Sequence, residues 1–344
     1  MKLKKIIQAV GFGLFSAILI LYVAPLVNKN SARFPSLSKI ESYNGAVKVA
    51  SPAVVNVYSQ AFETAQTQNN DEDLEINNLG SGVIMTSSGY ILTNKHVIEN
   101  ADKIIVALQS GAIYSAAVVG TDQLTDLAVL KIQADNLPTI PQNEKRKPQI
   151  GDVVLAIGNP LNLGQSITQG IVSAIGRNAL SDSMRQNFIQ TDASINKGNS
   201  GGALINTAGE LIGINTLSLG KNSAELAEGL NFSIPINIAN KVLKQIIQNG
   251  RVIRGYIGVS SSTFQLSNSG VLITGTAANG PAAKAGLRTA DLIISINDVE
   301  AESPEKMMNM IADMKPGDLA KIVVLRQGIL LEFDVVIDEF PETN

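Results

Sequence analysis

The stretch Asn196-Lys197-Gly198-Asn199-Ser200-Gly201-Gly202 places one serine among three glycines. Glycine allows positive φ angles and close backbone approach, so backbone N–H groups can converge beside the Ser200 hydroxyl, as binding of an oxyanion requires. The same letters fit an ordinary glycine-rich turn, and they also fit the G-x-S-x-G elbow of the α/β-hydrolases. The stretch alone therefore leaves a turn and two classes of hydrolase nucleophile open.

The position of the histidine decides between the hydrolase classes. The chain holds a single histidine, His96, which lies upstream of Ser200. An α/β-hydrolase needs its histidine after the serine, whereas the chymotrypsin class has the order His, Asp, Ser. We therefore expect Ser200 to be the nucleophile and His96 the general base. A packed or surface histidine is the alternative interpretation of His96.

An aspartate between His96 and Ser200 is expected to orient the imidazole. Asp126 directly precedes the apolar run Leu127-Ala128-Val129-Leu130, which is typical of a buried strand. A buried carboxylate holds an imidazole in the tautomer that catalysis needs, so Asp126 is the best candidate. Most of the other aspartates lie in polar turns, where a helix N-cap or a solvated charge is favoured. The six other aspartates between His96 and Ser200 are Asp102, Asp122, Asp135, Asp152, Asp182 and Asp192.

Composition excludes several kinds of site. The 344 residues suffice for about two domains. The absence of cysteine excludes disulfides, thiolate metal sites and a cysteine nucleophile, and one histidine argues against a histidine-rich metal site. We expect neither a metal nor another cofactor. Beyond residue 28 the chain holds 24 basic and 30 acidic residues, and this acidic balance argues against nucleic acid as a partner.

The N-terminus predicts a membrane anchor. Lys2, Lys4 and Lys5 precede an uncharged run of 22 residues, 6–27. A cleaved signal peptide would have a shorter apolar stretch and a small-x-small cleavage site, which this run lacks. We expect one uncleaved transmembrane helix in residues 1–28, with the N-terminus in the cytoplasm and the remainder in a bacterial periplasm. Residues 29–44 are polar and predict a linker.

The remaining pattern predicts a β-rich domain over residues 45–250 and a smaller domain over 251–340. Many short strands with Gly, Asn, Asp or Ser between them indicate a sandwich or barrel. A strand is expected over 53–58, and strands over 82–85 and 90–93 are expected to form a hairpin that ends just before His96. Further strands are expected over residues 103–108, 113–119, 127–132, 153–157, 170–175, 202–205 and 211–215. A polar loop is expected over 66–78, and a helix over 236–248 is expected to close the first domain at Gly250. The smaller domain is expected to have strands at 270–274, 292–296 and 321–325 and helices at 282–285 and 305–314.

Four motifs resemble the HtrA (Deg) family of serine proteases, and the resemblance extends over nearly the whole chain. They are Gly80-Ser81-Gly82-Val83-Ile84, Leu92-Thr93-Asn94-Lys95-His96-Val97, Thr125-Asp126-Leu127-Ala128-Val129-Leu130 and Gly198-Asn199-Ser200-Gly201-Gly202-Ala203-Leu204. The smaller domain resembles a single PDZ domain through Gly280-Pro281-Ala282-Ala283-Lys284-Ala285-Gly286-Leu287. The resemblance implies a mainly β fold, with a chymotrypsin-like double β-barrel followed by one α+β PDZ domain. Lys197 departs from the family, where proline or histidine is more frequent.

The resemblance also implies the surroundings of the catalytic residues. Backbone N–H groups of Gly198 and Ser200 would form the oxyanion hole. Ser194, Ile195 and Leu217 would flank the substrate pocket, which then holds no acidic residue to select Arg or Lys. Small or medium apolar residues are expected before the cleaved bond.

A second set of residues is implied for regulation. Tyr256, Ile257, Gly258 and Val259 match the carboxylate-binding loop of a PDZ domain, where a peptide would add as a strand; an ordinary strand start is the alternative. The resemblance implies that C-termini of misfolded outer-membrane proteins bind there and relieve inhibition of the protease. Arg177 matches an arginine that relays this signal, and a solvated charge is its alternative interpretation. The family forms trimers, so a homotrimer is expected.

Met307, Met308 and Ile311 have two interpretations, because residues at this helical spacing line a peptide groove or belong to a core. For the whole chain, the main hypothesis is a regulated endopeptidase that cuts a membrane-spanning anti-sigma factor. A general quality-control protease is a close alternative, although such relatives usually carry two PDZ domains. A catalytically inactive peptide-binding scaffold is the alternative of another class, and the intact His96 and Ser200 argue against it.

Overall fold

The computed structural model describes residues 11–14, 16–17, 42–62, 74–159, 164–177, 188–216, 229–261 and 270–341. Residues 11–14 and 16–17 are helical, and the rest of the expected anchor lies outside these ranges. Within them, no helix combines the length and the apolar character needed to cross a bilayer. The transmembrane helix therefore stays a prediction.

Six strands form the first closed barrel, in the order β1-β2-β3-β6-β5-β4. They are β1 (Val54–Phe62), β2 (Leu74–Ile84), β3 (Tyr90–Asn94), β4 (Lys103–Ala107), β5 (Ile113–Asp122) and β6 (Leu127–Lys131). Helix α2 (Asn44–Ala50) and the 3-10 turn η2 (Ser51–Ala53) precede β1, and the short helix α3 (Lys95–Ile98) follows β3. The apolar run of β6 is buried from Leu127 to Leu130, because the strand is covered on both faces.

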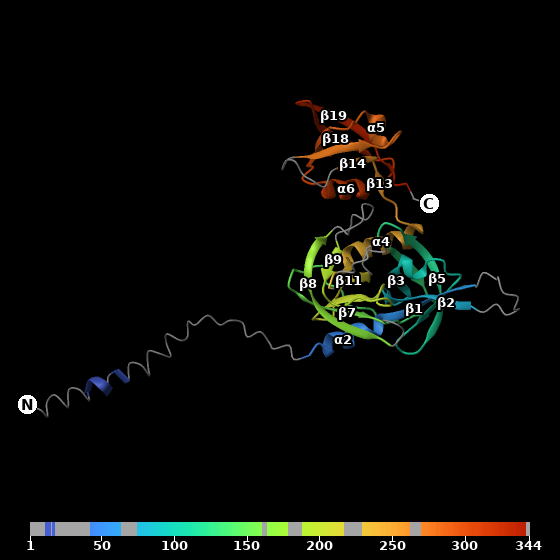
Figure 1. Cartoon of the computed structure of the whole chain (residues 1–344), viewed down its shortest axis with the longest axis vertical. Helices are drawn as coiled ribbons and strands as arrows, with labels where there is room; N and C mark the ends of the chain where they lie inside the picture. Colours follow the sequence, from blue (N-terminus) through green and yellow to red (C-terminus); the bar gives the residue numbers. More distant parts are fainter. Residues whose placement is uncertain are drawn as a thin grey trace, which may run out of the picture. The chain divides into compact units, whose positions relative to one another are not determined.

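Six further strands form a second closed barrel, in the order β10-β11-β12-β9-β8-β7. They are β7 (Val153–Gly158), β8 (Ser166–Arg177), β9 (Phe188–Thr191), β10 (Ala203–Asn206), β11 (Leu211–Thr216) and β12 (Asn231–Pro235). Strands β1 and β2 contact β7, and β3 contacts β11, so the two barrels meet along these strands (Figure 1). This architecture confirms the expected mainly β double barrel.

Helix α4 (Ile236–Asn249) packs against β5 and β6 of the first barrel and β11 and β12 of the second. Its apolar positions fall on one face, so Val242 and Ile246 are buried. Gly250 ends the helix at φ 75°, a left-handed conformation that glycine adopts without steric cost. The expected C-cap is therefore confirmed.

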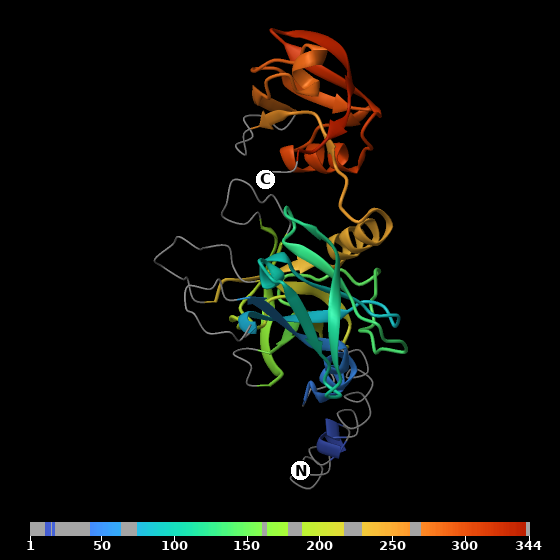
Figure 2. The ribbon, with the colours of Figure 1, turned by 90° about the vertical axis from the view of Figure 1, so that its right-hand side faces the viewer.

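The C-terminal part, coloured orange to red in Figure 2, holds one sheet in the order β14-β15-β16-β18-β19, with β17 paired to β16, and a separate ladder of β13 with β20. Its elements are β13 (Gly255–Tyr256), β14 (Val259–Ser261), β15 (Val271–Thr276), α5 (Pro281–Ala285), β16 (Leu292–Ile296), β17 (Val299–Glu300), α6 (Pro304–Asp313), β18 (Leu319–Arg326), β19 (Ile329–Val336) and β20 (Asp338–Glu339). Met307 and Ile311 are buried in its core and Met308 packs partly against it, which favours the core interpretation of this methionine spacing.

The structure differs from the sequence-based expectation at the polar stretch 66–78. Its last five residues, from 74 onward, belong to β2 and pair with β1, so the prediction of a loop there is wrong. Leu74 and Ile76 alternate with Glu75 and Asn77, which is a strand pattern, but it covers only four residues and directly follows a polar and acidic run. Residues 66–73 lie outside the described ranges. The prediction also missed α2, α3, β9, β12, β13, β17, β19 and β20.

Candidate active site

The end of β3 brings His96 against Asp126. The His96 Nδ1 atom lies 2.6 Å from Asp126 Oδ2, and the His96 backbone N–H donates to Asp126 Oδ1 at 3.0 Å. On the far side, the Thr216 hydroxyl donates to Asp126 Oδ2 at 3.4 Å. The Asp126 side chain is 19% exposed and that of His96 is 37% exposed. The carboxylate is thus partly buried, while the imidazole keeps a face toward solvent.

The backbone of Asp126 is held as firmly as its side chain. Its φ of 53° is left-handed, a region that aspartate tolerates better than most residues. Its carbonyl oxygen accepts hydrogen bonds from the Lys95 backbone N–H at 2.9 Å and from Asn94 Nδ2 at 3.0 Å. These contacts join the turn before β6 to the end of β3, so the backbone that carries the carboxylate is tied to the residues directly before the imidazole.

Ser200 lies in the turn between Asn196 and β10, and it is 3% exposed. Gly201, at φ 82°, follows it directly. A Cβ on Gly201 would lie 2.1 Å from the Ser81 carbonyl oxygen and 2.5 Å from Thr93 Oγ1. Only glycine fits this position, because the nucleophile turn packs directly onto the backbone of the first barrel.

Two backbone donors of this turn are available. The N–H groups of Gly198 and Ser200 donate to no other described residue. Both residues are buried, so the two donors lie in a region from which water is largely excluded. Paired N–H groups of this kind can stabilise the negative oxygen of a tetrahedral intermediate.

Gly80 lies where α3, which carries His96, meets the turn of residues 196–202 that carries the expected nucleophile Ser200. A Cβ at Gly80 would lie 2.6 Å from both Cγ atoms of Val97 and 3.1 Å from the Ser200 carbonyl oxygen. Gly80 therefore lies between the Val97 side chain and the Ser200 backbone, where a larger residue would not fit. Among the described residues, the Ser200 hydroxyl makes no hydrogen bond to His96. Such contacts are commonly loose in a free enzyme and tighten with substrate.

The expected substrate-pocket residues have different surroundings. Ser194 is exposed, and its carbonyl oxygen accepts a hydrogen bond from Thr168 Oγ1 at 2.8 Å. Ile195 is 4% exposed and packs into the core of the second barrel. Leu217 lies outside the described residues. Arg177 is the last residue of β8, directly before a segment outside the described residues.

The expected peptide-binding loop has the backbone of an anion site. Gly258, at φ 73°, follows Ile257, and the N–H groups of both donate to no described residue. Their carbonyl oxygens accept hydrogen bonds from elsewhere: Ala282 N–H donates to Ile257 and Ala277 N–H to Gly258, each at 2.8 Å. Consecutive backbone N–H groups that donate to no other residue can form a concavity that binds a carboxylate. Val259 then begins β14, at an edge of the sheet, while Tyr256 packs its ring on Phe340.

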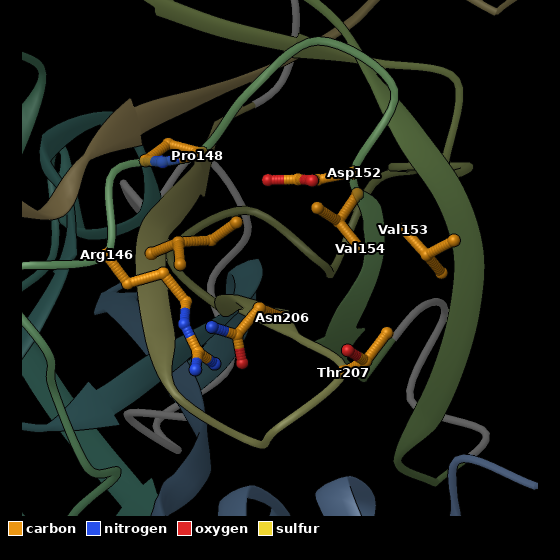
Figure 3. A pocket seen from close by; sticks show the side chains of 8 residues that line it. Arg146, Pro148, Asp152, Val153, Val154, Asn206 and Thr207 are labelled. Atoms are coloured by element: carbon orange, nitrogen blue, oxygen red, sulfur yellow. The ribbon is translucent and has the colours of Figure 1, made fainter. Parts of the chain in front are cut away.

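A surface hollow elsewhere on the second barrel has other residues in its wall. Arg146, Asp152 and Asn206 contribute to it (Figure 3). Beside it, Glu210 accepts hydrogen bonds from Asn206 Nδ2 at 2.6 Å and from Asn143 and Arg146. The hydrogen bond from Asn206, followed by that from Asn143, lowers the pKa of Glu210. The hollow contains none of the expected catalytic, substrate-pocket or peptide-binding residues. In the described ranges, no cluster of three or more His, Asp or Glu side chains is suited to a metal.

Two contacts of the site escaped sequence analysis. Thr216 reaches Asp126 from 90 positions away, and Ser81 reaches the nucleophile turn from 117 positions away. Ser81 belongs to the motif Gly80-Ser81-Gly82-Val83-Ile84, but the sequence links neither Ser81 nor Thr216 to its partner, because the contacts form only when the barrels pack. A hydroxyl near the start or end of a strand is too frequent to serve as a signal.

Comparisons with known proteins agree with this architecture. Residues 80–214 match the model of the trypsin-like peptidase domain, and residues 255–337 match that of the PDZ domain. The chain is 58% identical to the serine endoprotease DegS of Haemophilus influenzae, over 98% of this chain and 99% of that protein. It is 49% identical to the protein of the same name from Escherichia coli, over 99% of both.

Solved structures show the same likeness. The crystal structure of a serine endoprotease from Yersinia pestis is 51% identical, with a TM-score of 0.72, and covers 87% of this chain and 98% of its own. The HtrA-type protease AlgW, solved with a tripeptide, is 42% identical, with a TM-score of 0.78, and covers 88% of this chain and 98% of its own. With this identity over almost its full length, the chain belongs to the HtrA family of serine endoproteases, in which a trypsin-like peptidase domain is followed by a PDZ domain.

Proposed function

We propose that Ser200 attacks the scissile carbonyl while His96 accepts its proton and later donates it to the leaving amine. The observation that carries this assignment is the contact of 2.6 Å between His96 Nδ1 and Asp126 Oδ2. A carboxylate only accepts hydrogen bonds, so Nδ1 carries the proton and the Nε2 atom is left as the base. The free N–H groups of Gly198 and Ser200 would bind the oxyanion.

The proposed substrate site prefers small or medium apolar residues before the cleaved bond. The flanking residues expected from the sequence are Ser194, Ile195 and Leu217, and none of them is acidic. A substrate Arg or Lys would therefore meet no counter-charge from these three residues. In a peptide library, cleavage should occur mainly after small or medium apolar residues. A dominant product cut after lysine would contradict this preference.

The PDZ loop is proposed to bind the C-terminal carboxylate of misfolded outer-membrane proteins. Two features support it: the unbonded N–H groups of Ile257 and Gly258, and the edge strand β14 onto which an extended peptide can add. An HtrA-type relative has been solved with both a tripeptide and a decapeptide. Peptide binding would relieve inhibition of the protease, with Arg177 relaying the signal.

The physiological substrate is proposed to be a membrane-bound anti-sigma factor, whose cleavage starts an envelope stress response. The protein would be a homotrimer held in the inner membrane by residues 1–28, with its protease and PDZ domains in the periplasm. Several relatives are named periplasmic proteases, which supports this compartment. The 22-residue uncharged run near the N-terminus supports the anchor.

One experiment tests the regulated protease directly. The purified full chain in detergent is mixed with the periplasmic domain of a candidate anti-sigma factor, with and without a library of C-terminal peptides, and Ser200→Ala serves as control. Cleavage should rise with peptides that end in a free carboxylate and should stay at background with their C-terminally amidated versions. Cleavage that no peptide changes would reject the sensor and favour a constitutive quality-control protease. Activity in the Ser200→Ala protein would reject the nucleophile assignment.

A further inference from the structure

One buried serine of the first barrel, Ser81 in β2, contacts the nucleophile turn of the second barrel. Its Oγ donates to the Gly198 carbonyl oxygen at 2.7 Å and accepts a hydrogen bond from the Asn159 backbone N–H at 3.0 Å. Its own backbone N–H donates to the Ser200 carbonyl oxygen at 2.8 Å. Ser81 is fully buried, with 0% exposure. A single residue therefore binds the turn at two carbonyls, one on each side of Asn199.

The peptide group between Gly198 and Asn199 is held at both ends. Its carbonyl oxygen accepts the hydrogen bond from the Ser81 hydroxyl, and its N–H, which belongs to Asn199, donates to the Asn196 carbonyl oxygen at 2.9 Å. A peptide group is planar and rigid, so two hydrogen bonds at opposite ends define its orientation. The Gly198 N–H immediately before this plane is one of the two proposed oxyanion donors.

The next peptide but one is held in the same way. The Ser200 carbonyl oxygen accepts a hydrogen bond from the Ser81 backbone N–H, and the Gly201 N–H donates to the Asn215 carbonyl oxygen at 2.8 Å. The Ser200 N–H, the second proposed donor, therefore lies between two fixed planes. Ser81 supplies one hydrogen bond to each plane, with its hydroxyl for the first and its backbone for the second.

We propose that the Ser81 hydroxyl is a positioning residue for the oxyanion hole. It keeps the Gly198 carbonyl turned toward the first barrel, and the N–H groups of Gly198 and Ser200 thereby stay directed at the position of the oxyanion. This inference rests on the proposed role of Ser200. A merely structural role would instead resemble that of Ser59, an equally buried serine whose hydroxyl donates to the Val97 carbonyl oxygen at 2.6 Å.

Replacement by alanine separates the two contacts that Ser81 makes. Ser81→Ala removes the hydroxyl but keeps the backbone N–H that binds the Ser200 carbonyl. The Gly198 carbonyl and the Asn159 N–H then lose a partner in a buried region, and buried polar groups reorient toward whatever donor or acceptor is available. Rotation of the peptide between Gly198 and Asn199 would move the oxyanion donors, while the nucleophile stays in place.

The test compares Ser81→Ala with Ser59→Ala in the purified full chain, using a peptide substrate. A fluorophosphonate that labels Ser200 counts the competent sites, and a peptide aldehyde serves as a probe for the tetrahedral state. Loss of one oxyanion donor lowers kcat by about 10²- to 10³-fold, so a misdirected donor in Ser81→Ala should lower kcat per labelled site at least about tenfold. KM should change less than about threefold, and aldehyde affinity should fall with kcat/KM, because the oxyanion contact is made in the transition state.

The control and a second variant complete the test. Ser59→Ala should lower the melting temperature while keeping kcat per labelled site within about twofold of the parent, since its hydroxyl does not touch the nucleophile turn. Ser81→Cys retains a weak hydrogen-bond donor and introduces the sole thiol of the chain, so it should give an intermediate kcat. This variant also replaces Ser81→Ala if the alanine protein fails to fold. Labelling at Ser200 with kcat per site unchanged in the Ser81 variant that folds would overturn the positioning role alone. Absence of labelling at Ser200 in the parent protein, with the library of C-terminal peptides present to relieve inhibition, would overturn the proposed function as well.

Discussion

Replacement of Asp126 by asparagine should remove almost all activity without moving the side chain. The His96 backbone N–H donates to Oδ1 of Asp126, so the asparagine must place its carbonyl oxygen there and its amide nitrogen at the Oδ2 position. That nitrogen then donates toward His96 Nδ1, which lies 2.6 Å from Oδ2 in the parent protein. The imidazole must consequently carry its hydrogen on Nε2, where it cannot accept the proton of Ser200.

The expected size of the effect follows from this tautomer. An imidazole in the wrong tautomer lowers kcat by about 10⁴-fold in triads of this kind, which corresponds to roughly 5.4 kcal/mol of barrier at 1.36 kcal/mol per decade. By contrast, Thr216→Val removes only a long hydrogen bond of 3.4 Å to the same carboxylate, so we expect a loss of kcat below about tenfold.

Initial rates of peptide hydrolysis, normalised to correctly folded protein by circular dichroism, measure both effects. Asp135→Asn is the matched control, because Asp135 is an exposed aspartate between His96 and Ser200 and should leave kcat within about twofold of the parent. An Asp126→Asn protein that retains more than a tenth of the parental kcat would refute the tautomer argument. Equal losses in Asp126→Asn and Asp135→Asn would show that charge alone, rather than geometry, is responsible.

Three further predictions concern the nucleophile turn and the PDZ domain. Gly158→Ala would place a Cβ 2.7 Å from the Asn199 Cα, so kcat should fall more than KM rises, as steady-state kinetics would show; unchanged kinetics would contradict this. Gly258→Val would strain a φ of 73°, so binding of a C-terminal peptide in calorimetry should weaken at least about tenfold, and undiminished affinity would exclude the loop. Hydrogen bonds from Arg326 lower the pKa of buried Asp291. The ionised carboxylate therefore stabilises the PDZ domain at pH values above its ordinary pKa near 4, and this stabilisation is lost as the pH falls through the lower pKa of the folded state. Asp291→Asn should therefore speed amide exchange in β18 at neutral pH and reduce its acid dependence, and identical exchange in both proteins would refute the role.

The fold class was predictable because the patterns that encode it are local. Short apolar runs separated by turn residues indicate barrels, and the helix before Gly250 shows both its period and its C-cap. Strand extensions were less predictable. At the start of β2, Leu74 and Ile76 alternate with Glu75 and Asn77, but this alternation is too short to mark the strand against the polar run before it.

The sequence by itself determined the order of the proposed catalytic residues and, with it, the class of hydrolase. A single histidine before Ser200 excludes the α/β-hydrolase order, and glycines on either side of Ser200 permit a turn whose N–H groups are free. The run after Asp126 indicated a buried strand, and the structure buries it from Leu127 to Leu130. These inferences need only residue types and their sequence, which is why they could be made before any coordinates.

Only the tertiary structure decided which distant groups support the site. Ser81 and Gly198 are 117 positions apart, and Thr216 and Asp126 are 90 apart, yet each pair shares a hydrogen bond. Such contacts depend on how two closed barrels pack, and a hydroxyl in one barrel carries no mark of the backbone group that it will meet in the other. The proposed catalytic side chains can thus be identified from the sequence, whereas the hydrogen bonds that orient them arise from the interface between the barrels.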